Sequence, residues 1–260
     1  MNKIIEESIH LCNLSYYDNI NIMKMKNDEN LIPNKYDKSS MDFIKLNDIQ
    51  ICINAKLEFN LPNILYCFIN KTIYIVFCGR RKNTNIQDCL SYTLVYNDEI
   101  KCSIHNGFLY LFNQLKNEIK LILDVNKEKY DKIIFSGHSL GGSIAQIASL
   151  YFKVKHNFVN GCITFSTPLG GDNTFANEFN TNIDLKFTLC SQTDFAIKIP
   201  LWRYCNIDEK YMIDKNNKIV KYKDLDFIYL KNIFLLNIKT HTLYYHMEIL
   251  ANVEYQVTNE

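Results

Sequence analysis

Apolar residues along this chain fall into two patterns, one with helical spacing and one of short continuous runs. An apolar residue at every third or fourth position is typical of a helix with one buried face. This spacing predicts helices at residues 1–17, 106–125 and 140–152 and from about residue 242. Short apolar runs rich in β-branched residues are typical of strands that are buried on both faces. Such runs predict strands at residues 132–136, 162–165, 185–190 and 233–238.

Two further segments have the pattern of β-hairpins. Apolar runs at residues 63–69 and 72–77 are separated by two polar residues, and a similar arrangement spans residues 210–221. Two strand-like runs joined by a short polar turn favour antiparallel pairing. Residues 21–50 are polar and show neither helical spacing nor continuous apolar runs, so we expect them to be irregular.

Predicted strands alternate with predicted helices over most of the chain. This order is typical of the α/β class, in which a mostly parallel central sheet is flanked by helices. The chain has no internal repeat and no linker-like stretch, and 260 residues are compatible with one α/β domain. We therefore expect a single domain over residues 1–260, with an N-terminal helix and an irregular segment within residues 1–60.

Composition and charge narrow the classes of function. Hydrophobic residues make up 47% of the chain and charged residues 22%, which is typical of a globular protein and excludes the disordered and collagen-like classes. The 29 basic and 28 acidic residues nearly cancel, and no basic stripe stands out, so nucleic acid is not an expected partner. No run approaches the ~20 apolar residues of a membrane-spanning helix, so we expect no transmembrane segment.

The cysteines and the N-terminus bear on the compartment. The nine cysteines are odd in number and have no zinc-site spacing, so we expect free thiols and infer neither a metal nor another cofactor. Glu6 and Glu7 lie where a secretory signal would need an apolar core. These features favour a reducing, cytoplasmic location, and export by another route stays open.

Residues 132–142 have the pattern of a nucleophile elbow, the tight turn that presents a catalytic serine. An apolar strand is followed by G-x-S-x-G and then by a helix, which is the context this motif requires. Ser139 would lie at the start of the helix, where the dipole and free N–H groups favour negative charge. The N–H of Leu140 would donate to the oxyanion. The small residues that permit the sharp turn and close packing are Gly137, Gly141 and Gly142.

A serine nucleophile needs a histidine base, which in turn needs an acid that orients it. In this class of fold the acid and then the histidine follow the serine along the chain. His156 follows the elbow helix too closely and His246 lies inside the last predicted helix, whereas His241 lies in a loop before that helix. Asp194 closely follows the predicted strand at residues 185–190, but spacing alone leaves the choice among the downstream acids open.

Six motifs occur in a characteristic order. They are V-F-C-G at 76–79, H-N-G-F at 105–108, G-H-S-L-G-G at 137–142 with His138, T-F-S-T-P-L-G-G-D at 164–172, Q-T-D at 192–194 and H-T-L-Y at 241–244. Together they resemble the class 3 lipases, the fungal-type triacylglycerol lipases of the α/β-hydrolase fold, over about residues 60–250. The resemblance implies that Ser139 is the nucleophile, Asp194 the triad acid and His241 the base.

The chain also departs from the family pattern. In the family a Ser or Thr follows the oxyanion strand and supplies an N–H and often a hydroxyl, whereas Arg80 follows Gly79 here and keeps only the N–H. Ser166 replaces a glycine of the family. Asp88 resembles the acid that ends the family's lid and supports the oxyanion loop. The lid-like residues 80–87 are polar and begin with three cations, which favours a solvated face; attraction to an anionic lipid surface is the alternative.

The residues and the resemblance together predict a serine-dependent carboxylic-ester hydrolase of the triacylglycerol lipase type. It would act on lipid esters through an acyl-enzyme intermediate, with peripheral contact to a lipid interface. Two alternatives stay open. Arg80 and the polar lid are compatible with a weak or inactive lipase-like protein that binds or signals, and phospholipases and acyltransferases use the same triad.

Overall fold

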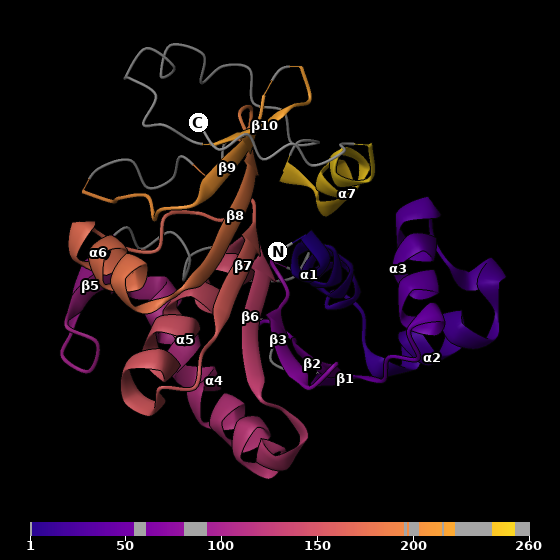
Figure 1. Ribbon diagram of the computed structural model, residues 1–260, viewed down its shortest axis with the longest axis horizontal. Coiled ribbons are helices and arrows are strands. Elements are labelled where there is room, and N and C mark those ends of the chain that lie inside the picture. Colours follow the sequence, from indigo (N-terminus) through magenta and orange to yellow (C-terminus); the bar gives the residue numbers. More distant parts are fainter. Residues whose placement is uncertain are drawn as a thin grey trace.

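One sheet of eight strands forms the centre of the computed structural model (Figure 1). The structure describes residues 2–54, 61–80, 93–194, 197, 203–214, 216–221 and 241–252. In order across the sheet, the strands are β1 (Ile51–Asn54), β2 (Ile64–Ile69), β3 (Thr72–Phe77), β6 (Lys132–His138), β7 (Gly161–Phe165), β8 (Leu185–Ser191), β9 (Lys210–Ile213) and β10 (Ile219–Lys221). A separate pair is formed by β4 (Leu94–Asn97) and β5 (Cys102–His105).

The middle of the sheet is parallel and its two margins are antiparallel. Strands β3, β6, β7, β8 and β9 pair in parallel, whereas β1–β2, β2–β3 and β9–β10 are antiparallel. Both predicted hairpins are thereby confirmed. In the first, Asn70 and Lys71 both have positive φ values, 47° and 59°, which is the two-residue turn whose twist matches that of the strands. The carboxyl ends of the parallel strands meet at one edge of the sheet.

Helices cover both faces of the sheet, as Figure 1 shows. The helices are α1 (Asn2–Leu14), α2 (Asn19–Asn27), α3 (Lys35–Leu46), α4 (Asn106–Val125), α5 (Leu140–His156), α6 (Asn173–Asn182), α7 (Leu243–Asn252) and the short 3₁₀ turns η1 (Glu29–Leu31) and η3 (Lys127–Lys129). Ile73 and Ile75 pack into the core with α4, α5 and α6, whereas Tyr74 and Val76 pack into the core with α1, α3 and α7. Alternate residues of the strand thus face opposite sides of the sheet. Because helices cover both sides, all these positions are apolar and the runs are continuous.

The expected α/β class is confirmed, and so are the predicted helices and the strands that the structure describes. Helix α4 has the predicted bounds, and α5 continues beyond the predicted end to His156. The predicted strand at residues 233–238 lies outside the described residues. Strands β1, β4 and β5 and helix α6 were not predicted, because the strands are only four residues long and α6 buries only Phe175, Ala176 and Phe179.

The expectation of an irregular stretch at residues 21–50 is wrong. Helices α2 and α3 begin at polar caps: the Asp18 side chain accepts from the N–H of Asn21, and the Asn34 side chain accepts from the N–H groups of the first turn of α3. Such caps satisfy N–H groups that have no partner within the helix. Because α2 buries only Ile22 and Met25, its apolar periodicity is too weak to be read from the sequence.

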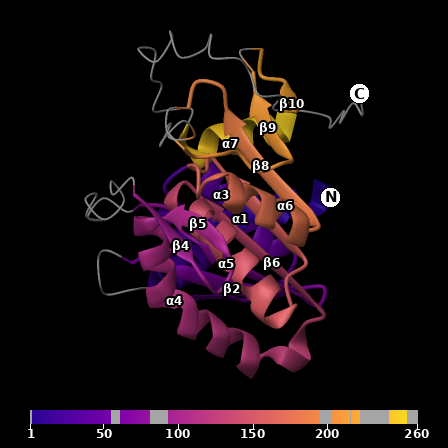
Figure 2. The ribbon, with the colours of Figure 1, turned by 90° about the vertical axis from the view of Figure 1, so that its left-hand side faces the viewer.

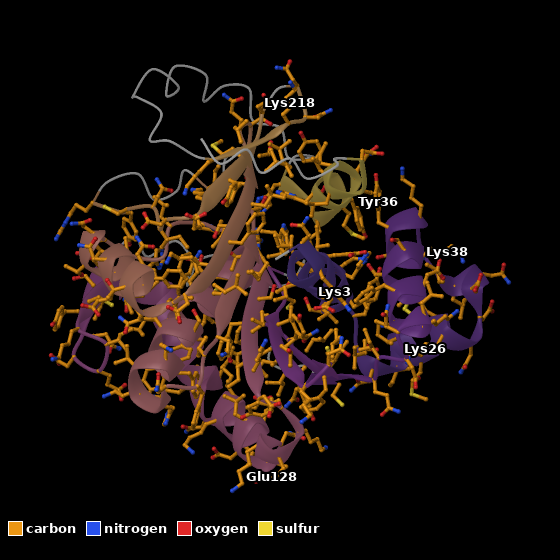
Figure 3. All side chains as sticks on the ribbon, in the orientation of Figure 1. Lys3, Lys26, Tyr36, Lys38, Glu128 and Lys218 are labelled. Carbon is orange, nitrogen blue, oxygen red and sulfur yellow. The ribbon has the colours of Figure 1, made fainter. Side chains whose placement is uncertain are left out.

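The N-terminal helices support the last helix of the described chain. The Tyr36 ring, from α3, stacks on the Tyr244 ring of α7 at a centroid distance of 5.0 Å, and its hydroxyl donates to Glu248 at 2.8 Å. Figure 3 shows Tyr36 between the two helices, with Lys26 and Lys38 at the outer side of the molecule. Figure 2 shows α7 and β8–β10 at one end of the molecule and α4 at the other. None of the described helices is both long and apolar enough to cross a membrane.

Candidate active site

A strained turn joins β6 to α5 and presents Ser139. The backbone of Ser139 has φ 55° and ψ −129°, a conformation that is costly for a residue with a side chain and that persists only where the surroundings enforce it. Its N–H donates to the carbonyl of Phe165 at 2.9 Å, and its carbonyl accepts from the N–H of Gly142 at 2.9 Å. These two bonds fix the turn, and Leu140 begins the helix directly after it.

The three glycines of the elbow lie where no side chain fits. A Cβ at Gly137 would overlap the backbone of Gly141, and a Cβ at Gly141 would overlap the carbonyl oxygens at the end of β3. A Cβ at Gly142 would overlap the side chain of Thr167, just after β7. The glycines therefore allow the start of α5 to lie directly against the ends of β3 and β7.

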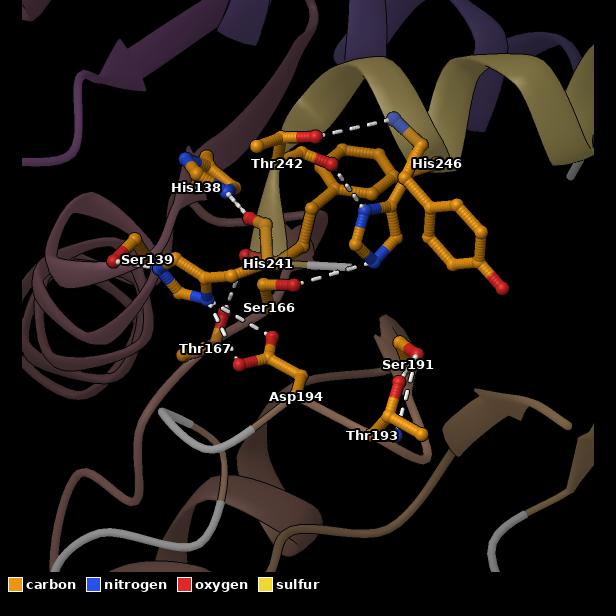
Figure 4. Close-up of polar contacts among 12 residues, drawn as sticks. His138, Ser139, Ser166, Thr167, Ser191, Thr193, Asp194, His241, Thr242 and His246 are labelled. Carbon is orange, nitrogen blue, oxygen red and sulfur yellow. Dashed lines mark hydrogen bonds and ion pairs between the residues drawn. The ribbon is translucent and has the colours of Figure 1, made fainter. Parts of the chain in front are cut away.

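Ser139, His241 and Asp194 form a continuous chain of hydrogen bonds (Figure 4). Ser139 Oγ lies 2.8 Å from His241 Nε2, and His241 Nδ1 lies 3.0 and 2.9 Å from the two carboxylate oxygens of Asp194. A carboxylate can only accept, so Nδ1 carries the proton, and Nε2 of the neutral ring accepts from the serine hydroxyl. Asp194 is completely buried, whereas the His241 side chain remains 19% exposed. The base can thus reach solvent while its acid cannot.

Three different elements supply these side chains. Ser139 follows β6, Asp194 follows β8, and His241 lies two residues before α7. A tight turn places the acid, because the N–H of Asp194 donates to the carbonyl of Ser191 at 3.1 Å. Other downstream acids have different partners: Asp172 caps α6, and Asp214 accepts from N–H groups of the β9–β10 turn. The geometry thereby settles which acid faces His241, a choice that sequence spacing left open.

His138 connects the elbow to the backbone of His241. Its Nε2 lies 2.7 Å from the His241 carbonyl, which can only accept, and its Nδ1 lies 2.6 Å from the hydroxyl of Tyr16. The imidazole therefore donates to the carbonyl and accepts from the phenol. Burial, together with the neighbouring His241 ring, lowers the pKa of His138 well below its ordinary value and keeps it neutral. Sequence reasoning missed this link, because Tyr16 and His138 lie 122 positions apart.

The segment after β3 passes close beside the elbow. A Cβ built on Gly79 would lie 2.9 Å from the His138 carbonyl oxygen and 3.2 Å from the Cβ of Ser139. Arg80 follows directly, and its side chain is exposed. Asp88 and the rest of the lid-like segment lie outside the described residues.

A cavity of about 310 Å³ lies beside the base. Its lining residues are Asn13, Tyr16, Tyr17, His138, His241, Thr242, Leu243 and Tyr244. A larger cavity of about 650 Å³, between α1, α3 and α7, has none of the three hydrogen-bonded residues in its lining, so we do not assign it to the site. Within the described parts of the chain, no three His, Cys, Asp or Glu side chains lie close enough together to hold a metal ion.

The fold and this arrangement define the class of protein. Helices cover both faces of a sheet with a parallel centre, and a serine at the strand–helix turn contacts a histidine and, through it, a buried acid. These are the features of an α/β hydrolase. Residues 74–204, about half of the chain, match the family model described as Lipase (class 3). The chain belongs to the class 3 lipase family.

Relatives with known names agree with this assignment. A lipase of Rhizomucor miehei is 29% identical over 157 residues, which cover 56% of this chain and 43% of the relative. The secreted mono- and diacylglycerol lipase 1 of Fusarium solani is 26% identical over 117 residues, or 44% of this chain and 35% of the relative. The chain thus spans less than half the length of these curated relatives. The solved structure of the Rhizomucor miehei triacylglyceride lipase superposes with a TM-score of 0.71 at 19% identity, covering 92% of each chain.

Proposed function

We propose that the protein hydrolyses carboxylic esters of lipids through Ser139, His241 and Asp194. The observation that carries the proposal is the hydrogen-bonded chain from the serine hydroxyl through the imidazole to a buried carboxylate. Membership of the class 3 lipases supports a lipid ester as the substrate class, and so do the two lipases that share part of the sequence. The site fits acyl transfer because each group has the partner that this chemistry requires.

In the first half of the reaction Ser139 Oγ attacks the acyl carbonyl while Nε2 of His241 takes its proton. Asp194 keeps its bond to Nδ1–H and stabilises the positive imidazolium. The neutral state of His138 adds no second positive charge beside it. His241 then gives the proton to the departing alcohol, which leaves the acyl group on the serine. In the second half His241 activates a water molecule, and the carboxylic acid is released.

The negative oxygen of each tetrahedral intermediate needs N–H donors. We assign this role to the backbone N–H groups of Leu140, at the start of α5, and Arg80, beside Gly79. The positive end of the helix dipole supports the first, and the close passage of Gly79 beside Ser139 supports the second. Asp88 is proposed, from the family resemblance, to support the loop that carries Arg80.

A panel of esters tests the proposal. Hydrolysis of p-nitrophenyl esters of increasing chain length, a triglyceride and a phospholipid would be measured, with Ser139→Ala as the blank. We expect rates that depend on both chain length and Ser139. Equal rates for all chain lengths that persist in the Ser139→Ala variant would contradict the proposal. Hydrolysis of the phospholipid alone would identify phospholipids, and not triglycerides, as the substrate class.

A binding protein with little or no turnover is the second candidate. It is favoured by Arg80, because the family hydroxyl at this position is absent and one oxyanion donor is worth about 2.7–4 kcal/mol. Arg80→Ser restores the hydroxyl and tests this directly. A large gain in kcat in Arg80→Ser would mean that the wild-type protein is a weak enzyme, as the second candidate requires. An unchanged or lower kcat would mean that Arg80 permits full activity.

Interfacial contact and location belong to the same proposal. We propose that the protein meets its substrate at a lipid surface. Attraction of the cations from Arg80 onward to anionic lipid is the alternative to a solvated face and would add a preference for anionic lipid. Equal, salt-independent sedimentation with anionic and neutral vesicles would contradict this preference. A reducing, cytoplasmic location is supported by free thiols at eight cysteines of the described chain. Fractionation of the source cells would test it.

A further inference from the structure

Two residues that the proposed mechanism does not use contact each other beside the active site. Ser166 stands where the family has glycine, and His246 is the second histidine near the end of the chain. Ser166 Oγ lies 3.3 Å from His246 Nε2, and His246 Nδ1 lies 3.0 Å from the carbonyl oxygen of Thr242 (Figure 4). Both side chains are completely buried.

The direction of these bonds follows from the acceptors. The Thr242 carbonyl can only accept, so His246 carries its proton on Nδ1. Nε2 is then an acceptor, and the Ser166 hydroxyl donates to it. This arrangement requires a neutral ring, and burial keeps it neutral by lowering the pKa of His246 to about 4.

The bonded carbonyl belongs to the residue next to the base. Thr242 follows His241 and caps α7, since its hydroxyl accepts from the N–H of Tyr245 at 3.4 Å. The preceding carbonyl, that of His241, accepts from His138 at 2.7 Å. Two neutral imidazoles, that of His138 in the elbow and that of His246 in α7, therefore hydrogen-bond to two consecutive carbonyls. The backbone that carries the base is therefore held at two consecutive peptide units.

Ser166 ties this arrangement to the rest of the site. The Phe165 carbonyl accepts from the N–H of Ser139 at 2.9 Å, and the N–H of Ser166 donates to the Leu189 carbonyl at 2.8 Å, on the strand that leads to the triad acid. Through Oγ the same residue reaches His246. Two consecutive residues at the end of β7 thus contact the elements that carry the nucleophile, the acid and the base.

The backbone of Ser166 shows that its side chain is retained at a cost. Its φ is 47°, in the left-handed region where glycine is favoured. Glycine would remove the strain and also the hydroxyl that satisfies His246. We propose that Ser166 and His246 are positioning residues, which hold the Thr242 backbone so that the His241 ring stays aligned between Ser139 and Asp194. This inference rests on the proposed function.

Isosteric variants of His246 test the proposal with a short soluble ester such as p-nitrophenyl butyrate. Asparagine places an amide N–H where Nδ1 lies and can still donate to Thr242, whereas glutamine places its amide nearer to Nε2 and cannot. We expect His246→Ala to lower kcat about 100-fold with little change in KM, because a displacement of about 1 Å in a catalytic group has this effect. His246→Asn should recover most of kcat, and His246→Gln should remain with the alanine variant.

Ser166→Ala removes only the hydrogen bond to His246 Nε2 and leaves the bond from His246 to Thr242, so we expect a loss of about tenfold in kcat. Melting temperatures are measured for all variants. If His246 acted in packing alone, kcat would follow the melting temperature and would not depend on which amide replaces the imidazole. Equal kcat values for the Asn and Gln variants, or wild-type kcat in His246→Ala, would overturn the inference while leaving the proposed function in place. An inactive wild-type protein would remove the proposed function, and the inference with it.

Discussion

Beside the β6–α5 turn, two serine–histidine pairs lie side by side, and they differ in what lies behind the histidine. Ser139 and Ser166 follow neighbouring parallel strands and have φ values of 55° and 47°. Each contacts the Nε2 atom of a histidine, at 2.8 Å for His241, just before α7, and at 3.3 Å for His246, in the first turn of α7. Behind His241 lies the carboxylate of Asp194, whereas behind His246 lies only a backbone carbonyl.

This difference separates a base from a positioning group. A general base gains a proton during the reaction, so it needs a negative partner and access to the substrate. His241 has both, with a buried carboxylate and a side chain that is 19% exposed. His246 hydrogen-bonds a backbone carbonyl in place of a carboxylate and is completely buried, and burial lowers its pKa to about 4, which opposes protonation. A serine–histidine contact is therefore insufficient to define a nucleophile.

The largest effect is expected from removing each serine in turn. Ser139→Ala should lower kcat by about 10⁵–10⁶-fold, because losing the nucleophile leaves only binding and oxyanion stabilisation. Ser166→Ala should lose only about tenfold, since it acts through another residue. Initial rates with a soluble ester measure both. Similar losses in the two variants would show that the pairs do not differ in the way described.

The carboxylate behind His241 is expected to give the next largest effect. Asp194→Asn keeps the size of the side chain but removes its charge and favours the wrong imidazole tautomer, so kcat should fall about 10⁴-fold. Asp172→Asn is the matched control, because Asn also caps helices well and Asp172 only caps α6. If the two variants retain similar activity, the carboxylate does not distinguish the pairs.

Acid should destabilise the fold through its neutral histidines. Burial lowers the pKa to about 4 for His10, His105 and His246. Between pH 6.5 and about 4 the unfolded chain binds more protons than the folded one, so stability falls as pH decreases through this window and is fully present above it. By pH 4 each of the three histidines would have lowered the free energy of unfolding by up to about 3 kcal/mol.

Urea denaturation at several pH values between 7 and 4 measures this loss. His246→Asn cannot take up a proton, so its stability should depend less steeply on pH than that of the wild type. A free energy of unfolding that stays constant from pH 7 to 4.5 would mean that these rings are not held neutral by the fold.

The smallest expected effect is on stability, from glycine at each strained serine. Ser139→Gly should raise the free energy of unfolding by about 1 kcal/mol, because it relieves a positive φ and water can reach the exposed part of His241. Ser166→Gly relieves similar strain but leaves the buried Nε2 of His246 without this donor, which costs about 1–3 kcal/mol. We expect no gain there. An equal gain at both sites would mean that the hydrogen bond between Ser166 and His246 contributes nothing to stability.

Local patterns could be read from the sequence, whereas contacts between distant residues could not. The elbow at 137–142 and helix α4 depend on neighbouring residues, and both were predicted. Spacing alone left Asp194 one of several acids and the family resemblance singled it out; the turn after β8 places it against His241. Ser166 stood out as a departure from the family and His246 as a rejected base, but their contact joins positions 80 residues apart. No local signal connects such positions.

The N-terminal segment was the largest error of fold, for a related reason. Helices α2 and α3 both begin at single polar caps; α2 buries only Ile22 and Met25, and two of the four residues that α3 buries, Asp37 and Ser40, are polar, so neither helix has a long apolar face in the sequence. Asp88, the lid-like segment and the strand at residues 233–238 remain predictions. The single domain over residues 1–260 does as well.

Labelling with a fluorophosphonate, followed by mass-spectrometric mapping of the modified peptide, tests the central claim most directly. The reagent reacts only with a serine that its base has activated. We predict one adduct, on Ser139, in the wild-type protein, its loss in Ser139→Ala and its retention in Ser166→Ala. A folded wild-type protein that carries no adduct, or one that carries it on Ser166, would contradict the assignment of Ser139 as the nucleophile.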